Sequence, residues 1–132
     1  MLLVDTNVLV DVLQDDPQWA DWSIGQLRAQ AAVHELVINP VIYAEMSLSF
    51  STIEALDAVV ARMELTLQEI PKPALFLAAK AFAQYRRRGG TKVQVLPDFF
   101  IGAHAAVRGW PLLTRDAARL RSYFPSLDVL AP

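Results

Sequence analysis

The sequence predicts an α/β fold with three layers, α/β/α, in which helices cover both faces of a mostly parallel central sheet. The strand candidates are short apolar runs without the polar alternation of a half-exposed strand, as is typical of strands buried on both faces. Between them lie longer segments with helical periodicity and capping residues. This alternation favours parallel strands over hairpins. Because no internal repeat, low-complexity run or linker is visible, we expect one domain over residues 1–132.

The first half of the chain predicts two strands and four helices. The strand candidates are residues 2–4 and 36–38. The expected helices are, in order, a segment over about residues 7–13, one from Pro17 that carries Trp19, Trp22 and Leu27, one after Asn39-Pro40 that carries Val41, Ala44, Glu45 and Leu48, and one from Ser51. In the last of these helices, Ser51 and Glu54 have the spacing of a capping box. Its apolar residues form one stripe: Ile53, Leu56, Val60 and Met63.

The second half of the chain predicts three more strands and three more helices. Residues 74–88 are expected to be helical until Gly89 and Gly90 end the helix. Asp98 is expected to open a helix that runs to about residue 107, and Asp116 to open a short one. The remaining strand candidates are residues 93–96, 111–113 and 129–130.

The composition is that of a globular protein. Hydrophobic residues make up 54% of the chain and charged residues 20%, so the chain can form a core and is not a disordered tail. Cysteine is absent, which excludes disulfide scaffolds, thiolate zinc sites and cysteine nucleophiles. There is no basic region before the first apolar run and no uncharged run of the ~18 residues that span a membrane, so we expect a cytoplasmic protein. The many apolar residues suggest that a partner covers part of the surface.

The net charge of −2 hides an uneven distribution. Residues 1–85 contain four basic residues against eleven acidic ones, whereas residues 86–121 contain eight basic residues against two acidic ones. A basic segment on an acidic protein is expected where one face binds phosphates. A solvated helix surface without a ligand explains the same charges, so charge alone does not decide between the two.

Four acidic residues fall where predicted strands end and helices begin. Asp5 directly follows the first strand, and Glu45 lies about one turn into the helix after the second. Asp98 begins a helix, and Asp116 closely follows the strand over residues 111–113. Ligands of open parallel sheets bind beyond the carboxyl ends of the strands. Taken singly, the three aspartates are equally explained as helix N-caps, but capping does not explain four acids at one sheet edge with no lysine nearby.

A cluster of carboxylates predicts a divalent metal ion. Carboxylates raise one another's pKa unless a cation compensates their charge. Mg²⁺ or Mn²⁺ suits this purpose because hard ions prefer oxygen ligands. Such an ion can polarise a phosphate and lower the pKa of a bound water.

These residues and their order resemble a known family. Asp5-Thr6-Asn7 after a first strand, a lone Glu45, and the segments over residues 98–103 and 113–116 are together similar to the PIN-domain ribonucleases. The length and order of the motifs resemble VapC, the toxin of VapBC toxin–antitoxin pairs. The similarity covers nearly the whole chain, although each motif is loose and residues 51–92 carry none.

The resemblance implies a PIN-like fold and an endoribonuclease that is the toxin of a type II toxin–antitoxin pair. It implies that Mg²⁺ or Mn²⁺ is held by Asp5, Glu45, Asp98 and Asp116, which form both the catalytic and the metal site. It also implies an RNA substrate, a homodimer, and an antitoxin protein that blocks the groove. All four acids are present, so the sequence shows no sign of an inactive member.

Three residues close to these acids are candidates for a supporting role. Asn7 either orients Asp5 or caps the first helix. Thr114 either holds a water or phosphate near Asp116 or bonds to the backbone at the strand end. Arg115 is better placed for a phosphate contact than for catalysis.

Other candidates are weaker. Arg86, Arg87 and Arg88 either contact an RNA backbone or complement the helix dipole. Phe99 and Phe100 could stack on bases, but at least one of them is expected in the core. His104 lies about two turns beyond Asp98 and is expected to be structural.

Two other functions remain open. A non-catalytic interaction module, in which the aspartates are only caps, predicts no stabilisation by divalent ions. An aspartate-based phosphotransfer or phosphatase domain also places acids at strand ends. It fits poorly, because Asn7 stands where such a phosphatase has its second aspartate and no lysine follows Lys92.

Overall fold

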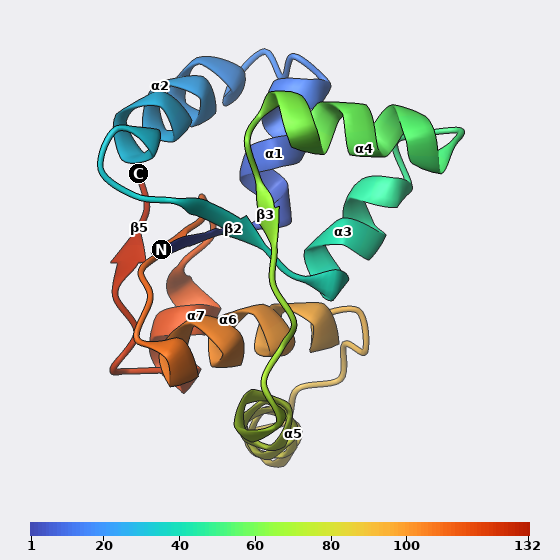
Figure 1. Cartoon of the computed structure of the whole chain (residues 1–132). Helices are drawn as coiled ribbons and strands as arrows, with labels where there is room; N and C mark the ends of the chain where they lie inside the picture. The colour runs from blue at the N-terminus through green and yellow to red at the C-terminus, as the bar shows by residue number, and fades with distance from the viewer.

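Five short parallel strands form the centre of the molecule (Figure 1). The computed structural model describes residues 1–132. The strands are β1 (Leu2–Val4), β2 (Leu36–Ile38), β3 (Thr66–Leu67), β4 (Leu112–Leu113) and β5 (Val129–Leu130). Their order in the sheet is β3-β2-β1-β4-β5, and every neighbouring pair is parallel. The predicted parallel sheet is therefore confirmed, with β1 at its centre.

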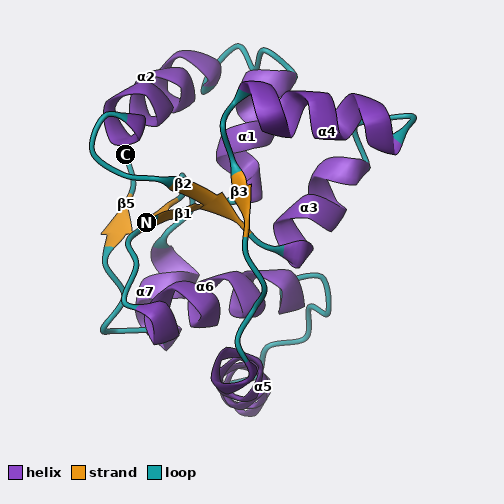
Figure 2. Ribbon diagram, in the orientation of Figure 1, coloured by secondary structure: helices purple, strands orange, loops and turns teal.

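Helices cover both faces of this sheet, which confirms the predicted three layers. The helices are α1 (Thr6–Leu13), α2 (Ala20–Ala31), α3 (Pro40–Ser47), α4 (Ile53–Arg62), α5 (Lys72–Arg87), α6 (Leu96–Arg108) and α7 (Ala118–Tyr123). Helices α1, α2 and α4 lie on one side of the sheet and α5, α6 and α7 on the other (Figure 2). Helix α3 lies beyond the end of β2 and contacts both α1 and α6. None of the helices has the length and apolar character needed to cross a bilayer.

The core explains why the central strand has no alternating pattern. All three residues of β1 are fully buried because helices pack on both of its faces. Helix α6 is the most deeply packed helix, with residues 101–105 all buried. At its start, Phe99 is 1% exposed and packs against aromatic rings of α5 and α7. The prediction that at least one of Phe99 and Phe100 lies in the core is thus confirmed.

One predicted strand is wrong and one strand was not predicted. Residues 93–96 form a turn and the start of α6 rather than a strand. Val95 is the N-cap residue of α6 and Pro97 lies in its first turn, where proline favours a helix. The third strand is instead β3, which pairs with β2 at the sheet edge. It has only two residues, neither of them buried, so the sequence carries no apolar signal for it.

Several helix starts differ from the prediction. Helix α2 begins at Ala20 rather than Pro17, because the Asp16 carboxylate accepts the backbone N–H groups of Gln18 and Trp19 in a preceding turn. The cap of α4 is Thr52, whose hydroxyl accepts from the Ala55 N–H, so the predicted capping box is absent.

Of the three aspartates that could be N-caps, only Asp5 is one. Its carboxylate accepts the Thr6 N–H at 2.7 Å. Asp98 lies within the first turn of α6, and Asp116 precedes the cap residue of α7. Capping therefore does not account for Asp98 or Asp116.

We predict that Gly102→Ala lowers the free energy of unfolding by roughly 1–3 kcal/mol, the usual cost of overpacking. A Cβ on Gly102 would lie 2.7 Å from Phe124 Cε2 and 2.8 Å from Leu120 Cδ2, because α6 approaches α7 closely there. Gly25→Ala in α2 is the matched control, since its Cβ would meet nothing within 4 Å. It should raise the free energy of unfolding by roughly 0.5–1 kcal/mol through helix propensity. Urea unfolding measures both free energies of unfolding. A change of the same sign in the two variants would contradict the prediction.

Candidate active site

The strand order changes direction between β1 and β4. From β1 the chain continues to β2 and β3 toward one sheet edge, whereas β4 and β5 lead to the other. The helices that follow β1 and β4 lie on opposite sides of the sheet (Figure 1). Such a switch point leaves a crevice at the carboxyl ends of the two strands, where ligands of α/β folds bind. Asp5 and Asp116 both lie at the carboxyl ends of these two strands, because they directly or closely follow them in the chain.

The register of the sheet places Asp5 beside Thr114. Val4 is opposite Leu113, so Asp5 and Thr114 leave their strands together. The Asp5 N–H donates to the Leu113 carbonyl at 2.9 Å. Beyond this bond, the Thr114 hydroxyl donates to Asp5 Oδ2 at 2.8 Å. Asn7 Nδ2 lies 3.3 Å from the same oxygen and 3.2 Å from Thr114 Oγ1. The structure thus places Asn7 beside Asp5, and the cap of α1 is Asp5 itself.

The four predicted acids lie close enough together for their charges to act on the two buried aspartates, Asp5 and Asp98. Burial raises the pKa of Asp5 to about 7, and the charges of Asp98 and Glu45 add to this effect. Hydrogen bonds from Thr114 and Thr6 to the carboxylate offset part of the rise in its pKa. Burial also raises the pKa of Asp98, with the charges of Glu45 and Asp116 acting in the same direction and Arg119 opposing them. The four side chains therefore form one electrostatic group, called the acid group below.

Two members of the acid group are held by partners that the sequence did not indicate. Glu45 Oε1 accepts a hydrogen bond from the Thr6 hydroxyl at 2.7 Å. Asp98 Oδ2 pairs with Arg119 Nη1 of α7 at 3.2 Å. Asp116 has an exposed side chain, while its backbone N–H donates to Thr114 Oγ1 at 3.1 Å.

The donor chemistry of the acid group fits a hard divalent cation. It offers only carboxylate oxygens, which Mg²⁺ and Mn²⁺ prefer. Burial is the main cause of the raised pKa values of Asp5 and Asp98, and the neighbouring carboxylates add to it, so a cation bound there would favour the ionised forms. As the side chains stand, no three acidic or histidine residues lie close enough together to form a ligand set. Glu45 accepts a hydrogen bond from Thr6, and Asp98 accepts one from Arg119. These two carboxylates would exchange their present partners for a bound cation.

Comparison with known proteins identifies the family. The model of the PIN domain matches residues 2–123, which include all four acids. The chain belongs to the PIN domain family. PIN domains are generally nucleases that use divalent metal ions. A search of curated proteins finds no significant match.

Solved structures show the same PIN fold at low sequence identity. VapBC2 from Rickettsia felis, bound to a DNA fragment from its promoter, matches with a TM-score of 0.74 and 16% identity, over 98% of this chain and 97% of that one. VapBC-1 from nontypeable Haemophilus influenzae matches with a TM-score of 0.74 and 14% identity, over 98% and 96% of the chains. FitAcB from Neisseria gonorrhoeae matches with a TM-score of 0.68 and 18% identity, over 100% of this chain and 98% of that one. The resemblance to a VapC-like PIN domain is therefore confirmed at the level of fold.

Arg115, expected from the sequence as a possible phosphate contact, is paired with an acid outside the acid group of this PIN domain. Its guanidinium is bound to Asp11 of α1, with Nε 2.8 Å from Oδ2 and Nη2 3.0 Å from Oδ1. Asp11 is 2% exposed, which is unusual for an acidic residue unless it is paired. No local pattern in the sequence indicates this contact, because Asp11 and Arg115 are 104 positions apart.

The arginines at the end of α5 lie on the same aromatic cluster as Arg119. Arg88 lies over the Tyr123 ring at 4.9 Å and Arg119 over the Tyr85 ring at 5.9 Å. These two tyrosine rings are 6.2 Å apart. Because Arg119 also pairs with Asp98, the cluster brings α5 cations toward the acid group. Exposed Arg86, Arg87 and Arg88 with Arg119 are called the basic ridge below.

His104 is part of the core of the PIN domain rather than of its acid group. It is fully buried, and its Nδ1 lies 3.1 Å from Asn39 Nδ2. Asn39 in turn caps α3, since its Oδ1 accepts the Ile42 N–H. Burial, with a smaller effect of the Arg108 charge, lowers the pKa of His104 to about 4. His104 is therefore neutral at physiological pH, which agrees with the structural role expected from the sequence.

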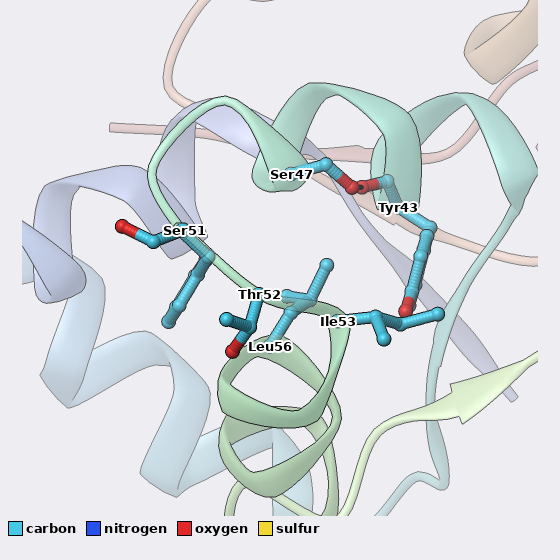
Figure 3. A pocket seen from close by; sticks show the side chains of 7 residues that line it. Tyr43, Ser47, Ser51, Thr52, Ile53 and Leu56 are labelled. Atoms are coloured by element: carbon cyan, nitrogen blue, oxygen red, sulfur yellow. Dashed lines mark hydrogen bonds between the residues drawn. The ribbon is translucent and has the colours of Figure 1, made fainter.

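A hollow of about 210 Å³ lies between α3 and the start of α4 (Figure 3). Tyr43 and Ser47 line it from α3 and Thr52, Ile53 and Leu56 from the other side. The two α3 residues are each two positions from Glu45, so a helix turns them away from the Glu45 carboxylate. The hollow is thus separate from the acid group.

We predict that the free energy of unfolding depends differently on pH in the metal-free wild type and in its Asp5→Asn variant. The pKa of Asp5 is about 7 in the folded protein and 3.8 for an unperturbed aspartate. Between these two pH values the folded protein therefore binds a proton that the unfolded chain has released. The wild type should therefore lose stability relative to the variant as pH rises from 4 to 8, by on the order of 2–4 kcal/mol. The opposite contribution of His104 is common to both proteins and cancels. Urea unfolding in a chelator at several pH values measures the difference, which would be constant if Asp5 were not perturbed.

Proposed function

We propose that this PIN domain, spanning residues 1–132, is a metal-dependent endoribonuclease that hydrolyses RNA phosphodiester bonds in the cytoplasm. The observation that carries the proposal is the acid group at the β1/β4 switch point, with Arg119 of the basic ridge bonded to Asp98. Carboxylates suit a divalent cation, and a row of arginines suits a phosphate backbone. The family match and the resemblance of the motifs to PIN-domain ribonucleases support the same reaction.

Asp5, Glu45, Asp98 and Asp116 would hold Mg²⁺ or Mn²⁺. A divalent ion bound there supplies Lewis acidity toward a phosphate and lowers the pKa of a bound water. The hydroxyls of Thr6 and Thr114 donate to Glu45 and Asp5, so both carboxylates are held in a fixed orientation. Asn7 adds a third donor beside Asp5.

The basic ridge would bind the RNA backbone and hold the scissile phosphate against the acids. Arg119 is the cation nearest to the reaction, because it bonds directly to Asp98. Its guanidinium can turn from Asp98 to a phosphate oxygen and stabilise the charge that develops there. Arg86, Arg87 and Arg88 lie farther along the ridge, where they would contact neighbouring phosphates.

We further propose that the protein is the toxin of a type II toxin–antitoxin pair, with an antitoxin protein and a second copy of itself as partners. Similar structures include VapBC complexes and a toxin–antitoxin complex from Klebsiella pneumoniae. An apolar groove of about 420 Å³ between α1, α2 and α4 supports the antitoxin. Arg28 and Arg62 also line this groove, which suits an acidic amphipathic helix. Exposed Ile53 and Phe76 support contacts with a second copy.

We predict that purified protein cleaves single-stranded RNA only with Mg²⁺ or Mn²⁺, and that Asp98→Asn lowers the rate roughly 100-fold or more, the scale for losing one electrostatic stabiliser. Asp21→Asn is the matched control, because Asp21 is exposed on α2 and its charge is not among those that shift the pKa of Asp5 or Asp98. Gel analysis of end-labelled RNA measures the rates.

The result separates the proposal from its alternatives. If the wild type cleaves no RNA and its melting temperature does not rise with Mn²⁺, the non-catalytic module is the better description. Equal cleavage by Asp98→Asn and wild type would remove the acid group from the reaction.

We predict that Arg86→Gln and Arg88→Gln each lower the slope of log affinity against log salt by about 0.7, the effect of one phosphate contact on a single strand. Lys72→Gln is the control, because Lys72 is exposed at the opposite end of α5 and should leave the slope unchanged. Fluorescence anisotropy with a labelled RNA in the Asp98→Asn background measures binding without cleavage. Unchanged slopes for both arginine variants would leave Arg86 and Arg88 as partners of the helix dipole only.

A further inference from the structure

One face of α1 holds Arg115 at two points. Asn7 and Asp11 lie four residues apart on α1 and therefore share a face. Asn7 Oδ1 accepts the backbone N–H of Arg115 at 3.3 Å. Asp11 accepts both the Nε and the Nη2 of its guanidinium, at 2.8 Å and 3.0 Å. Backbone and side chain of one loop residue are thus bound to the same helix.

The Asp11 carboxylate is saturated with donors inside the protein. In addition to the two bonds from Arg115, it accepts the Ser23 hydroxyl of α2 at 3.0 Å. Trp19 covers the guanidinium, with its ring 5.6 Å from Cζ. Asp11, Ser23, Trp19 and Arg115 are called the clasp below. The Asp11 side chain is 2% exposed and the Arg115 side chain 32% exposed. The contact resists opening because the buried Asp11 carboxylate would be left without its charged partner.

Arg115 connects the clasp to the acid group because it lies between Thr114 and Asp116. The Thr114 hydroxyl donates to Asp5 and accepts the Asp116 N–H at 3.1 Å. The carboxylate of Asp116 is exposed and has no hydrogen bond of its own in the protein. Its position therefore depends on the backbone of residues 114–116, and the clasp is what holds the middle of that segment.

We propose that Asp11 is a positioning residue that acts through Arg115 to fix the loop carrying Asp116, and that Arg115 is not an RNA contact. The bidentate guanidinium is occupied by a buried carboxylate, so it is not free to bind a phosphate. For its effect on the reaction, this inference rests on the proposed nuclease function. Its effect on the loop does not depend on that function.

The first test measures the loop without any reaction. In Asp11→Asn and Arg115→Met, the backbone amides of Arg115 and Asp116 should exchange with solvent at least about 10-fold faster, as expected when a local contact is opened. The double variant should exchange no faster than either single variant, because both changes break one contact. Asp21→Asn, the same substitution on the exposed surface of α2, should leave the exchange unchanged. Unchanged exchange in the two single variants would overturn the inference.

The second test asks whether the loop positions the acid group. Mn²⁺ binding should weaken by roughly 10-fold in both single variants, the range for loss of a supporting contact around a metal site. On RNA, kcat should fall with KM unchanged. Arg115→Lys keeps the charge but not the two-point contact, so it should recover only part of the loss. Full recovery by lysine, with a raised KM in Arg115→Met, would instead indicate a phosphate contact and overturn the inference.

The salt dependence of RNA binding distinguishes the two roles of arginine directly. Arg115→Met should leave the slope of log affinity against log salt unchanged, whereas Arg88→Gln should make this negative slope shallower by about 0.7. A drop of that size in Arg115→Met would overturn the inference. If the wild type binds no Mn²⁺ and cleaves no RNA, the proposed function fails. Amide exchange then still decides whether the clasp holds the loop.

Discussion

The hydrogen bond from the Thr114 hydroxyl to Asp5 is the contact on which the rest of the site depends. It joins residues 109 positions apart in the chain, at the point where β1 and β4 end side by side. It gives a buried carboxylate a donor that burial would otherwise deny it. Thr114 also accepts the N–H of Asp116, so the same hydroxyl connects the acids that follow the two central strands.

The same clustering of carboxylates that suits the site for chemistry lowers the stability of the metal-free protein. Burial and the neighbouring acids raise the pKa of Asp5 to about 7, so gathering the carboxylates costs the metal-free protein free energy. A protein without a function for these acids would gain stability by neutralising one of them. The interactions around the group, from Thr6, Asn7, Thr114 and Arg119, act to keep the carboxylates in place despite that cost.

Core packing and the site share the same short segments. Asp98 and Phe99 are neighbours at the start of α6, one in the acid group and the other 1% exposed among aromatic rings. The rings around Phe99 include Tyr85 and Tyr123, on which Arg119 and Arg88 lie. One aromatic cluster therefore positions an acid on one side and the basic ridge on the other. A change in this part of the core is expected to alter both.

The sequence by itself determined those features that depend on local chemistry. Apolar runs long enough to be recognised became β1 and β2, and strand ends followed by helices account for the positions of Asp5, Glu45 and Asp116. Asp98 lies in the first turn of α6, and the strand predicted before it is absent. Only the tertiary structure decided the features that depend on distant partners. The two-residue β3 exists because β2 offers it a free edge. Arg115 pairs with Asp11, 104 positions away, and Arg119 pairs with Asp98 from the next helix. Local propensity acts over a few residues, whereas the partner of a long charged side chain is set by what the fold brings within its reach.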